Sequence, residues 1–304
     1  MSIGIASATS PLPRSAVRAR LADYVELTKL RIVVMELATV LATLHVASRG
    51  DWQWGLALAL VIGTALVAGS ASALNQWLEQ EQDALMLRTR NRPLPAGRLS
   101  RGEVLTLGLV MLAAGFTILL FGVNQVVAAI AAATWVIYVA LYTPLKTRWT
   151  FNTTVGAVSG ALPILMGWFA GGGDFGATAI GLFAVLAVWQ YPHFMAIAWL
   201  CRDDYQRAGY RMSSTADPTG ASCGWQAIIG SVLLVPAALI LLGDIPSPTL
   251  GTLAYVVTAA ILAGLMLRSS LNFHHHRTDQ SARTLMRVSL LYLPLWLLAF
   301  VLCC

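Results

Sequence analysis

Three side chains that can supply oxygen ligands recur at four-residue intervals in the segment NQWLEQEQDALMLRTRNRPLP, namely Asn75, Glu79 and Asp83. In a helix, this spacing places successive side chains about 5 to 6 Å apart along one face. Carboxylate and amide oxygens suit a hard cation such as Mg²⁺, which proteins commonly bind through one or two carboxylates together with substrate phosphates. The spacing therefore predicts a magnesium site that receives a phosphorylated substrate.

Basic side chains follow these acids, among them Arg88 and Arg92. Because Pro93 favours an extended backbone at the residue before it, the helix is expected to end there in a basic loop. Guanidinium groups bind phosphate oxygens through two parallel hydrogen bonds. Farther along, the segment LYTPLKTRW offers Lys146 and Arg148 as further phosphate donors. Each of these charges, taken alone, also fits a basic loop at a membrane surface.

A second acidic cluster lies in the segment WLCRDDYQRAGYRM, where Asp203 or Asp204 could complete the metal site. The preceding segment WQYPHF contains Pro192, which removes a backbone donor and predicts a kink. If the helix resumes after the kink, His193 and Asp204 lie on nearly the same face, with His193 about 16 Å deeper. At that depth a histidine either faces a cavity or bonds to a neighbouring helix.

The elements that must position these residues are membrane spans. The chain has 304 residues, of which 57% are hydrophobic and 11% are charged, and its mean hydropathy of +0.69 lies outside the range of ordinary soluble domains. About 20 apolar residues are needed to cross a bilayer as a helix. Nine apolar runs approach this length, at residues 32–47, 56–74, 103–122, 125–143, 154–170, 177–200, 226–242, 250–267 and 288–303.

The basic residues test this count, because Lys and Arg in short loops gather on the cytoplasmic side. With nine spans, every basic residue except Arg49 falls on one side, which predicts a cytoplasmic N-terminus. The net charge of +6 then reflects topology and anionic headgroups, and a nucleic acid partner is not needed. We expect an N-terminal cytoplasmic segment at 1–26 and a single transmembrane domain at 27–304. A mitochondrial transit peptide is the less favoured reading of the first 22 residues.

The motifs together resemble those of the UbiA superfamily of intramembrane prenyltransferases, and the likeness covers nearly the whole chain. The acid-arginine segment marks the superfamily, while WQYPHF and the DDYQRAG segment are similar to its heme-modifying branch. The other segments that carry the likeness are LTKLRI, YTPLKTR, GALPILMGW and SLLYLPLW.

The resemblance implies an all-α fold of nine transmembrane helices around a central cavity open to the cytoplasm. It also implies Mg²⁺-dependent binding of farnesyl diphosphate and transfer of the farnesyl group to a vinyl group of heme B, giving heme O. The expected setting is the bacterial inner membrane, with heme A synthase or the assembly of a terminal oxidase as the partner. The mitochondrial inner membrane is less favoured.

The resemblance also implies roles for individual residues. The metal is expected on Asn75, Glu79, Asp83 and Asp204. Catalytic roles are expected for Asn75, Glu79, Asp83, Asp203, Asp204 and Lys146. Aromatic faces that stabilise the farnesyl cation are expected at Tyr142, Trp189 and Tyr205, and His193 is expected to orient the porphyrin or ligate its iron. The full set of expected substrate-binding residues is Arg88, Arg92, Arg148, Lys29, Arg31, Tyr142, His193, Trp189, Tyr205 and Arg207.

The sequence departs from the superfamily pattern in two places that concern the metal. Glu79 stands where much of the superfamily has Asp, and the second motif lacks two acids four residues apart, since Asp203 is followed at that spacing by Arg207. Three alternative functions remain open: prenyl transfer to another acceptor such as 4-hydroxybenzoate, secondary transport, and non-catalytic heme handling. The cytoplasmic position of the acids argues against transport, because transporters bind near the bilayer midplane.

Overall fold

The computed structural model describes residues 14–243 and 249–303, with side chains described from Arg18 onward, and throughout these residues the regular structure is helical. Nine helical segments within this part of the chain are long and apolar enough to cross a membrane, which confirms the predicted count. The spans are α2 (Leu30–Ala47), α3 (Trp54–Leu78), α5 (Arg101–Gly122), α6 (Gln125–Trp135) continued by the π-helix η1 (Val136–Tyr142) and α7 (Thr143–Leu145), α8 (Asn152–Ala161) continued by α9 (Pro163–Ala170), α10 (Ala177–Leu200), α13 (Ala221–Ile240), α14 (Leu250–His276) and α15 (Asp279–Cys303).

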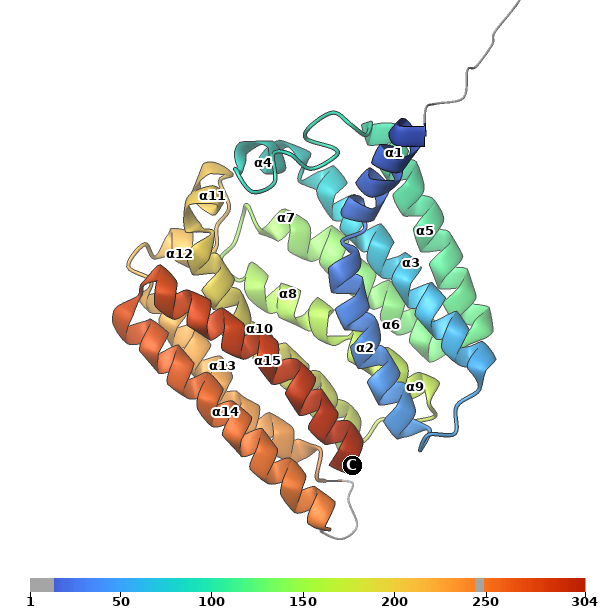
Figure 1. Ribbon diagram of the computed structural model, residues 1–304, viewed down its shortest axis with the longest axis vertical. Coiled ribbons are helices and arrows are strands. Elements are labelled where there is room, and N and C mark those ends of the chain that lie inside the picture. Colours follow the sequence, from blue (N-terminus) through green and yellow to red (C-terminus); the bar gives the residue numbers. More distant parts are fainter. Residues whose placement is uncertain (1–13, 244–248, 304) are drawn as a thin grey trace, which may run out of the picture.

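Four shorter helices lie at one end of the bundle, along the top and upper left side of Figure 1. They are α1 (Arg14–Leu27), α4 (Gln80–Leu85), α11 (Arg202–Arg207) and α12 (Ser213–Ala216). The part of α1 that carries described side chains is tied to the bundle, because Arg20 pairs with Glu103 of α5 and Gln76 of α3 donates to the carbonyl of Leu27 (2.7 Å). The expected domain boundary at 26/27 therefore falls at the end of a docked helix, and residues 1–13 of the expected N-terminal segment lie outside the described residues.

Large apolar side chains cover the outer surface of the bundle, including Val110 and Phe121 on α5, Ile261 on α14 and Leu291 on α15. Exposed apolar surface of this extent would aggregate in water but is solvated by lipid tails. Helices satisfy all of their internal backbone hydrogen bonds, which hydrocarbon demands. The protein is therefore a multi-pass membrane protein. The side on which its N-terminus lies remains a prediction.

Small residues allow the helices to approach closely, as the glycines of α8 predict. A Cβ added to Gly156 would lie 2.8 Å from the ring of Tyr142 on η1, and one added to Gly160 would overlap the side chain of Gln190 on α10. Gln190 in turn donates to the carbonyl of Ala157 (2.9 Å). The close approach of α8 thus sets the position of η1, which carries part of the site described below.

Two helices expected to be continuous are interrupted. The first break comes at Glu79 (φ −96°, ψ 14°), which separates α3 from α4. The second comes at Cys201 (φ −106°, ψ 14°), between α10 and α11. The expectation that His193 and Asp204 share a face of one helix is therefore wrong, since α10 runs through Pro192 but ends before Asp204.

Candidate active site

A cavity opens at the end of the bundle that carries α4 and α11, and its volume is about 770 Å³. It is bordered by the last turns of α1 and the start of α2, by the junction of α3 and α4, by the loop after α4, by η1 with the residue after α7, and by the segment from α11 to α12. The lining residues are Val25, Glu26, Lys29, Leu30, Arg31, Ile32, Asn75, Glu79, Asp83, Met86, Arg88, Arg92, Tyr142, Lys146, Tyr205, Tyr210 and Met212.

The three oxygen-bearing residues predicted from the sequence line this cavity together, even though the helix breaks between them. Glu79 donates its backbone N–H to the carbonyl of Asn75 (3.0 Å), and Asp83 donates to the carbonyl of Glu79 (2.8 Å). These bonds keep the four-residue hydrogen-bonding step of a helix across the break. All three side chains are buried, with Asp83 completely inaccessible.

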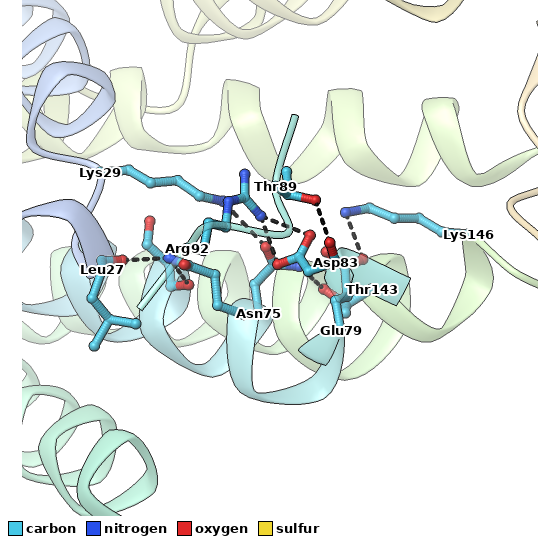
Figure 2. Close-up of polar contacts among 11 residues, drawn as sticks. Leu27, Lys29, Asn75, Glu79, Asp83, Thr89, Arg92, Thr143 and Lys146 are labelled. Carbon is cyan, nitrogen blue, oxygen red and sulfur yellow. Dashed lines mark hydrogen bonds and ion pairs between the residues drawn. The ribbon is translucent and has the colours of Figure 1, made fainter. Parts of the chain in front are cut away.

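A cation faces each of these three side chains, as Figure 2 shows. The first pair joins Lys29 Nζ to Asn75 Oδ1 at 3.2 Å, and the amide nitrogen of Asn75 donates to Thr143 Oγ1 at 3.0 Å. Lys29 lies between α1 and α2 with its backbone in the left-handed region (φ 51°, ψ 48°), which separates the two helices. This sharp turn lets a residue from the N-terminal part of the chain reach the polar face of α3.

The second pair joins Lys146 Nζ to Glu79 Oε1 at 2.8 Å. Burial opposes the positive charge of Lys146, but the Glu79 carboxylate and the nearby phenols outweigh this effect and raise the pKa of Lys146 well above its ordinary 10.5. The ammonium also lies 4.7 Å from the ring centre of Tyr142 and 5.9 Å from that of Tyr210. Lys146 is therefore a fixed positive charge in the cavity wall.

The third pair is a buried ion pair between Asp83 and Arg92. Arg92 Nη1 lies 2.9 Å from Asp83 Oδ1 and 2.7 Å from Oδ2. The chain reverses between the two residues because Met86 is extended (φ −90°, ψ 131°) and Thr89 Oγ1 donates to the carbonyl of Asp83 at 2.9 Å. The loop after α4 thus folds back over the acids and brings Arg88 and Arg92 to the cavity.

The π-helix η1 orients the cavity wall on the side of Lys146. Pro144 has no N–H to donate back along the helix, and the preceding turns adopt the wider π-helical hydrogen-bonding pattern. Thr143 Oγ1 donates to the carbonyl of Tyr138 (2.9 Å) within this segment. As a result Tyr142 and Lys146, four residues apart, face the same cavity.

Two phenols from the segment after α10 complete the wall. The ring of Tyr205, a predicted site residue, lies 5.8 Å from that of Tyr210, which sequence reasoning missed. Gly209 (φ +70°) reverses the chain, so that Tyr210 donates its N–H to the carbonyl of Tyr205 at 2.9 Å. Burial and then Glu79 raise the pKa of Tyr210, and burial is the main cause of the raised pKa of Tyr205. The sequence Ala-Gly-Tyr at 208–210 could have indicated that Tyr210 belongs to the site, because a glycine turn brings the following aromatic ring back toward Tyr205.

The two acids of the second motif, Asp203 and Asp204, are not among the residues that line the cavity, although Tyr205 and Tyr210 of the same segment are. Asp203 is exposed to solvent. Asp204 Oδ1 accepts hydrogen bonds from the backbone N–H of Leu87 (3.0 Å) and from Arg207 Nη1 (2.6 Å). The predicted placement of Asp204 among the metal ligands therefore differs from the observed geometry, and Arg207 points to this carboxylate and not to the cavity.

Three other predicted residues also lie away from the cavity. Arg148 borders a separate surface hollow beside Arg211. The ring of His193 stacks on that of Trp189 with 5.0 Å between their centres, and His193 Nδ1 lies 2.9 Å from Ser289 Oγ of α15. Trp189 Nε1 donates to the carbonyl of Ser289 at 2.8 Å. The structure thus places His193 in contact with a neighbouring helix, which was one of the two expectations for it.

The donor set at the polar face fits a magnesium ion. Among the described residues, no group of three or more His, Cys, Asp or Glu side chains gathers to hold a metal. The face at Asn75, Glu79 and Asp83 instead offers two carboxylates and one amide oxygen. That composition is too poor in ligands for a closed structural site, but it suits Mg²⁺, which takes its other ligands from water and substrate phosphates.

Comparisons with known proteins define the class to which this fold and site belong. Residues 37–291 match the model of the UbiA prenyltransferase family, and the chain belongs to that family. A curated relative from Rhodopirellula baltica, named protoheme IX farnesyltransferase, is 46% identical over 289 residues, which cover 91% of this chain and 98% of the relative. A relative of the same name from Solibacter usitatus is 39% identical, with 90% and 95% of the two chains covered.

Solved structures share the fold at low sequence identity. A structure described as digeranylgeranylglyceryl phosphate synthase aligns with a TM-score of 0.73 at 15% identity, covering 94% of this chain and 98% of that one. A UbiA homologue from Archaeoglobus fulgidus, bound to GPP and Mg²⁺, aligns with a TM-score of 0.59 at 16% identity, covering 91% and 99%. At these identities the likeness concerns the fold alone.

Proposed function

We propose that this protein is a protoheme IX farnesyltransferase, which transfers the farnesyl group of farnesyl diphosphate to a vinyl group of heme B to give heme O. The observation that carries the proposal is the cavity in which Asn75, Glu79 and Asp83 each face a cation. The names of full-length relatives at 39 to 46% identity support the choice of heme B as the acceptor.

The diphosphate end of the substrate belongs at the polar face of the cavity. Asn75, Glu79 and Asp83 would hold Mg²⁺, which when bound supplies charge neutralisation to the leaving diphosphate. Lys29, Arg88, Arg92 and Lys146 surround the same space and can donate to phosphate oxygens. Because positive groups are fixed where negative charge develops, they favour cleavage of the allylic C–O bond.

The existing ion pairs imply that these cations change partners when substrate binds. Lys146 pairs with Glu79, and Arg92 with Asp83. The carboxylate oxygens that these cations occupy are the same oxygens that would bind a divalent metal. We infer that diphosphate takes over the cations as the metal takes over the carboxylates. Binding of diphosphate and of Mg²⁺ should therefore be cooperative, each strengthening the other.

The apolar part of the cavity fits the isoprenoid chain. Leu30 and Ile32 at the start of α2 contribute to one wall, and Met86 and Met212 contribute near the polar face. The rings of Tyr142, Tyr205 and Tyr210 line the same cavity, where aromatic faces can stabilise an allylic cation. Their bulk also keeps bulk water from the cation until the acceptor has reacted.

The reaction balances without an oxidant or reductant. The C–O bond of farnesyl diphosphate breaks with its electron pair on diphosphate, and the vinyl carbon of heme B forms the new C–C bond. Water then adds to the cation left on the porphyrin side chain and loses a proton, which gives the hydroxyethylfarnesyl group. We propose that His193 acts on the acceptor side: because Ser289 engages Nδ1, Nε2 is the nitrogen left to contact the porphyrin or its iron.

We propose a bacterial inner membrane as the location, with the N-terminus and the site on the cytoplasmic side. The support is the bacterial origin of the relatives and the presence of all but one of the basic residues on one side of nine spans. Heme O would pass to heme A synthase or to a terminal oxidase during assembly.

The direct test is to incubate membranes containing the protein with heme B, farnesyl diphosphate and Mg²⁺ and to identify heme O by chromatography and mass. Membranes from the same host without the protein provide the control. Formation of heme O only with all three components is expected. Farnesylation of 4-hydroxybenzoate in place of heme B would refute the choice of acceptor, and metal-independent heme binding without product would refute prenyl transfer.

A further inference from the structure

The carboxylate of Asp204 makes its contacts with the loop that carries the phosphate-binding arginines. Its Oδ1 accepts from the N–H of Leu87 at 3.0 Å, and its Oδ2 lies 3.4 Å from the N–H of Arg88. Arg207, one turn later on α11, holds the same carboxylate at 2.6 Å. Asp204 therefore bridges the second acidic motif to the backbone of the first motif.

This contact continues into the apolar core beneath it. Met86 packs in one buried cluster with Ala208, Tyr210 and Met212. On the other side of the cavity, Arg211 donates its N–H to the carbonyl of Lys146 at 2.7 Å. The segment from Cys201 to Met212 thus touches two of the parts of the chain that supply phosphate donors, the loop after α4 and the end of α7.

The loop after α4 has turn bonds of its own, since Arg90 donates its N–H to the carbonyl of Met86 at 2.9 Å, whereas the N–H groups of Leu87 and Arg88 bond to Asp204. Met86 is extended, so α4 ends there, and Leu87 and Arg88 are exposed at their side chains. A carboxylate that accepts from two successive N–H groups forms charge-assisted hydrogen bonds, which are stronger than neutral ones. These bonds hold the backbone at Leu87 and Arg88, and they act together with the Thr89–Asp83 bond that reverses the chain before Arg92.

We propose that Asp204 is a positioning residue for the diphosphate-binding loop and not a metal ligand. The proposal rests on the proposed function in that Arg88 and Arg92 are taken as diphosphate donors. The geometry supports it directly: Arg88 and Arg92 line the cavity, whereas Asp204 does not line it, and its oxygens accept from the backbone of Leu87 and Arg88 and from the side chain of Arg207.

Leu87→Pro is the sharpest test, because it deletes the N–H that Asp204 accepts and leaves every carboxylate in place. Met86 has an extended backbone (ψ 131°), which is the conformation that a following proline favours. Leu87→Ala is the matched control, since it shortens the same exposed side chain and keeps the N–H. Asp204→Asn and Asp204→Ala form the second series, in which Asn retains an acceptor for Leu87.

Mobility of the loop can be read without any catalysis, by limited trypsin digestion of the full-length protein in lipid nanodiscs. Cleavage after Arg88 and Arg90 reports opening of the loop, because proteolysis follows the open population when opening is fast. We expect cleavage about 10-fold faster in Leu87→Pro and Asp204→Ala than in wild type, since a hydrogen bond to a charged group is lost. Leu87→Ala and Asp204→Asn should stay within about threefold.

Two binding measurements separate positioning from metal ligation. The dissociation constant of inorganic pyrophosphate in the presence of Mg²⁺, measured by calorimetry, should rise about 10-fold in Leu87→Pro. The affinity for Mn²⁺ at saturating pyrophosphate, measured by electron paramagnetic resonance, should stay within about threefold of wild type in Asp204→Asn, as expected of a residue that does not ligate the metal.

The opposite pattern would overturn the proposal: Leu87→Pro behaving like Leu87→Ala, with Asp204→Asn losing Mn²⁺ affinity. If Asp204→Ala does not fold, the comparison of Leu87→Pro with Leu87→Ala, together with Asp204→Asn, still tests the proposal. The proteolysis result also stands apart from the proposed function. If Leu87→Pro is cleaved faster but the wild-type protein makes no heme O, the role of Asp204 in holding the loop would stand and the farnesyltransferase assignment would be refuted.

Discussion

Replacement of Asp83 by asparagine tests whether this carboxylate serves both the metal and the fold. Asp83 is completely buried, and Arg92 contacts both of its oxygens, at 2.9 and 2.7 Å. Asparagine keeps the shape and one oxygen acceptor but removes the charge. Loss of a hydrogen bond to a charged group costs about 1.5–3 kcal/mol in unfolding free energy. Asp83→Ala, which leaves Arg92 without a partner, should cost about 3–5 kcal/mol.

The effect of Asp83→Asn on catalysis should exceed its effect on stability. The carboxylate is an expected metal ligand, and removal of one group that stabilises developing charge typically lowers the rate about 100- to 1,000-fold. Heme O formation by the purified protein in nanodiscs measures the rate, and thermal unfolding without added metal measures stability. The Asp83→Asn rate should fall by at least about 100-fold while the protein remains folded at the assay temperature.

Glu81→Gln is the matched control, because Glu81 lies on the same short helix α4 but is exposed. This change should alter the unfolding free energy by no more than about 0.5 kcal/mol. Arg92→Gln removes the same ion pair from the other side, and the double variant should lose less stability than the sum of the single losses, since the two residues interact. Wild-type rate and stability in Asp83→Asn would refute both roles.

Three further predictions follow from the cavity wall. Lys146→Met should lower heme O formation about 100-fold. Because the pKa of Lys146 is raised above 10.5, its positive charge is complete below that pH and is lost only as pH rises through the raised value. Between pH 7 and 10, wild type and Lys146→Met should therefore show the same dependence of rate on pH. Gly156→Ala should place a Cβ 2.8 Å from the Tyr142 ring, and it should therefore lower the unfolding free energy by about 1–3 kcal/mol and raise KM for farnesyl diphosphate. Gly264→Ala is the control, because open space surrounds its added Cβ, and it should change neither the stability nor KM. Equal thermal stability of the two variants would contradict this prediction. His193→Gln should weaken heme B binding about 10-fold in an absorbance titration and leave pyrophosphate binding unchanged, as loss of a contact worth about 1.4 kcal/mol would.

The sequence sufficed for the architecture because the bilayer imposes a length and a composition on every span. Apolar runs near the length of a membrane helix predicted nine spans, and nine are found in the described residues. Errors fell at the ends, where hydropathy stops being informative. Helix α14 continues to His276, beyond the expected end at 267. Its last turns contain polar residues, which hydropathy does not count as part of a span.

The polar face was also predictable, since a four-residue spacing is a local property of a helix. Asn75, Glu79 and Asp83 line one cavity even though the helix is interrupted at Glu79, because the backbone hydrogen bonds across the interruption keep the four-residue spacing of a helix. The arginine loop was predictable because its charges lie close to the acids in sequence. Its start was predicted wrongly, since the helix ends at Leu85, where Met86 becomes extended, and not at Pro93.

What the tertiary structure decided is which groups from distant segments meet. The pairs of Lys146 with Glu79 and of Lys29 with Asn75 join different helices, so they depend on how each helix is rotated and tilted. The π-helix at Val136–Tyr142 precedes Lys146 and orients it, and the left-handed turn at Lys29 orients the other lysine. Asp204 shows the limit most clearly: its residue type suited a metal ligand, but the break at Cys201 turns its carboxylate toward the backbone of Leu87. Composition fixes which charges a helix carries, whereas packing between helices fixes the direction in which each charge points.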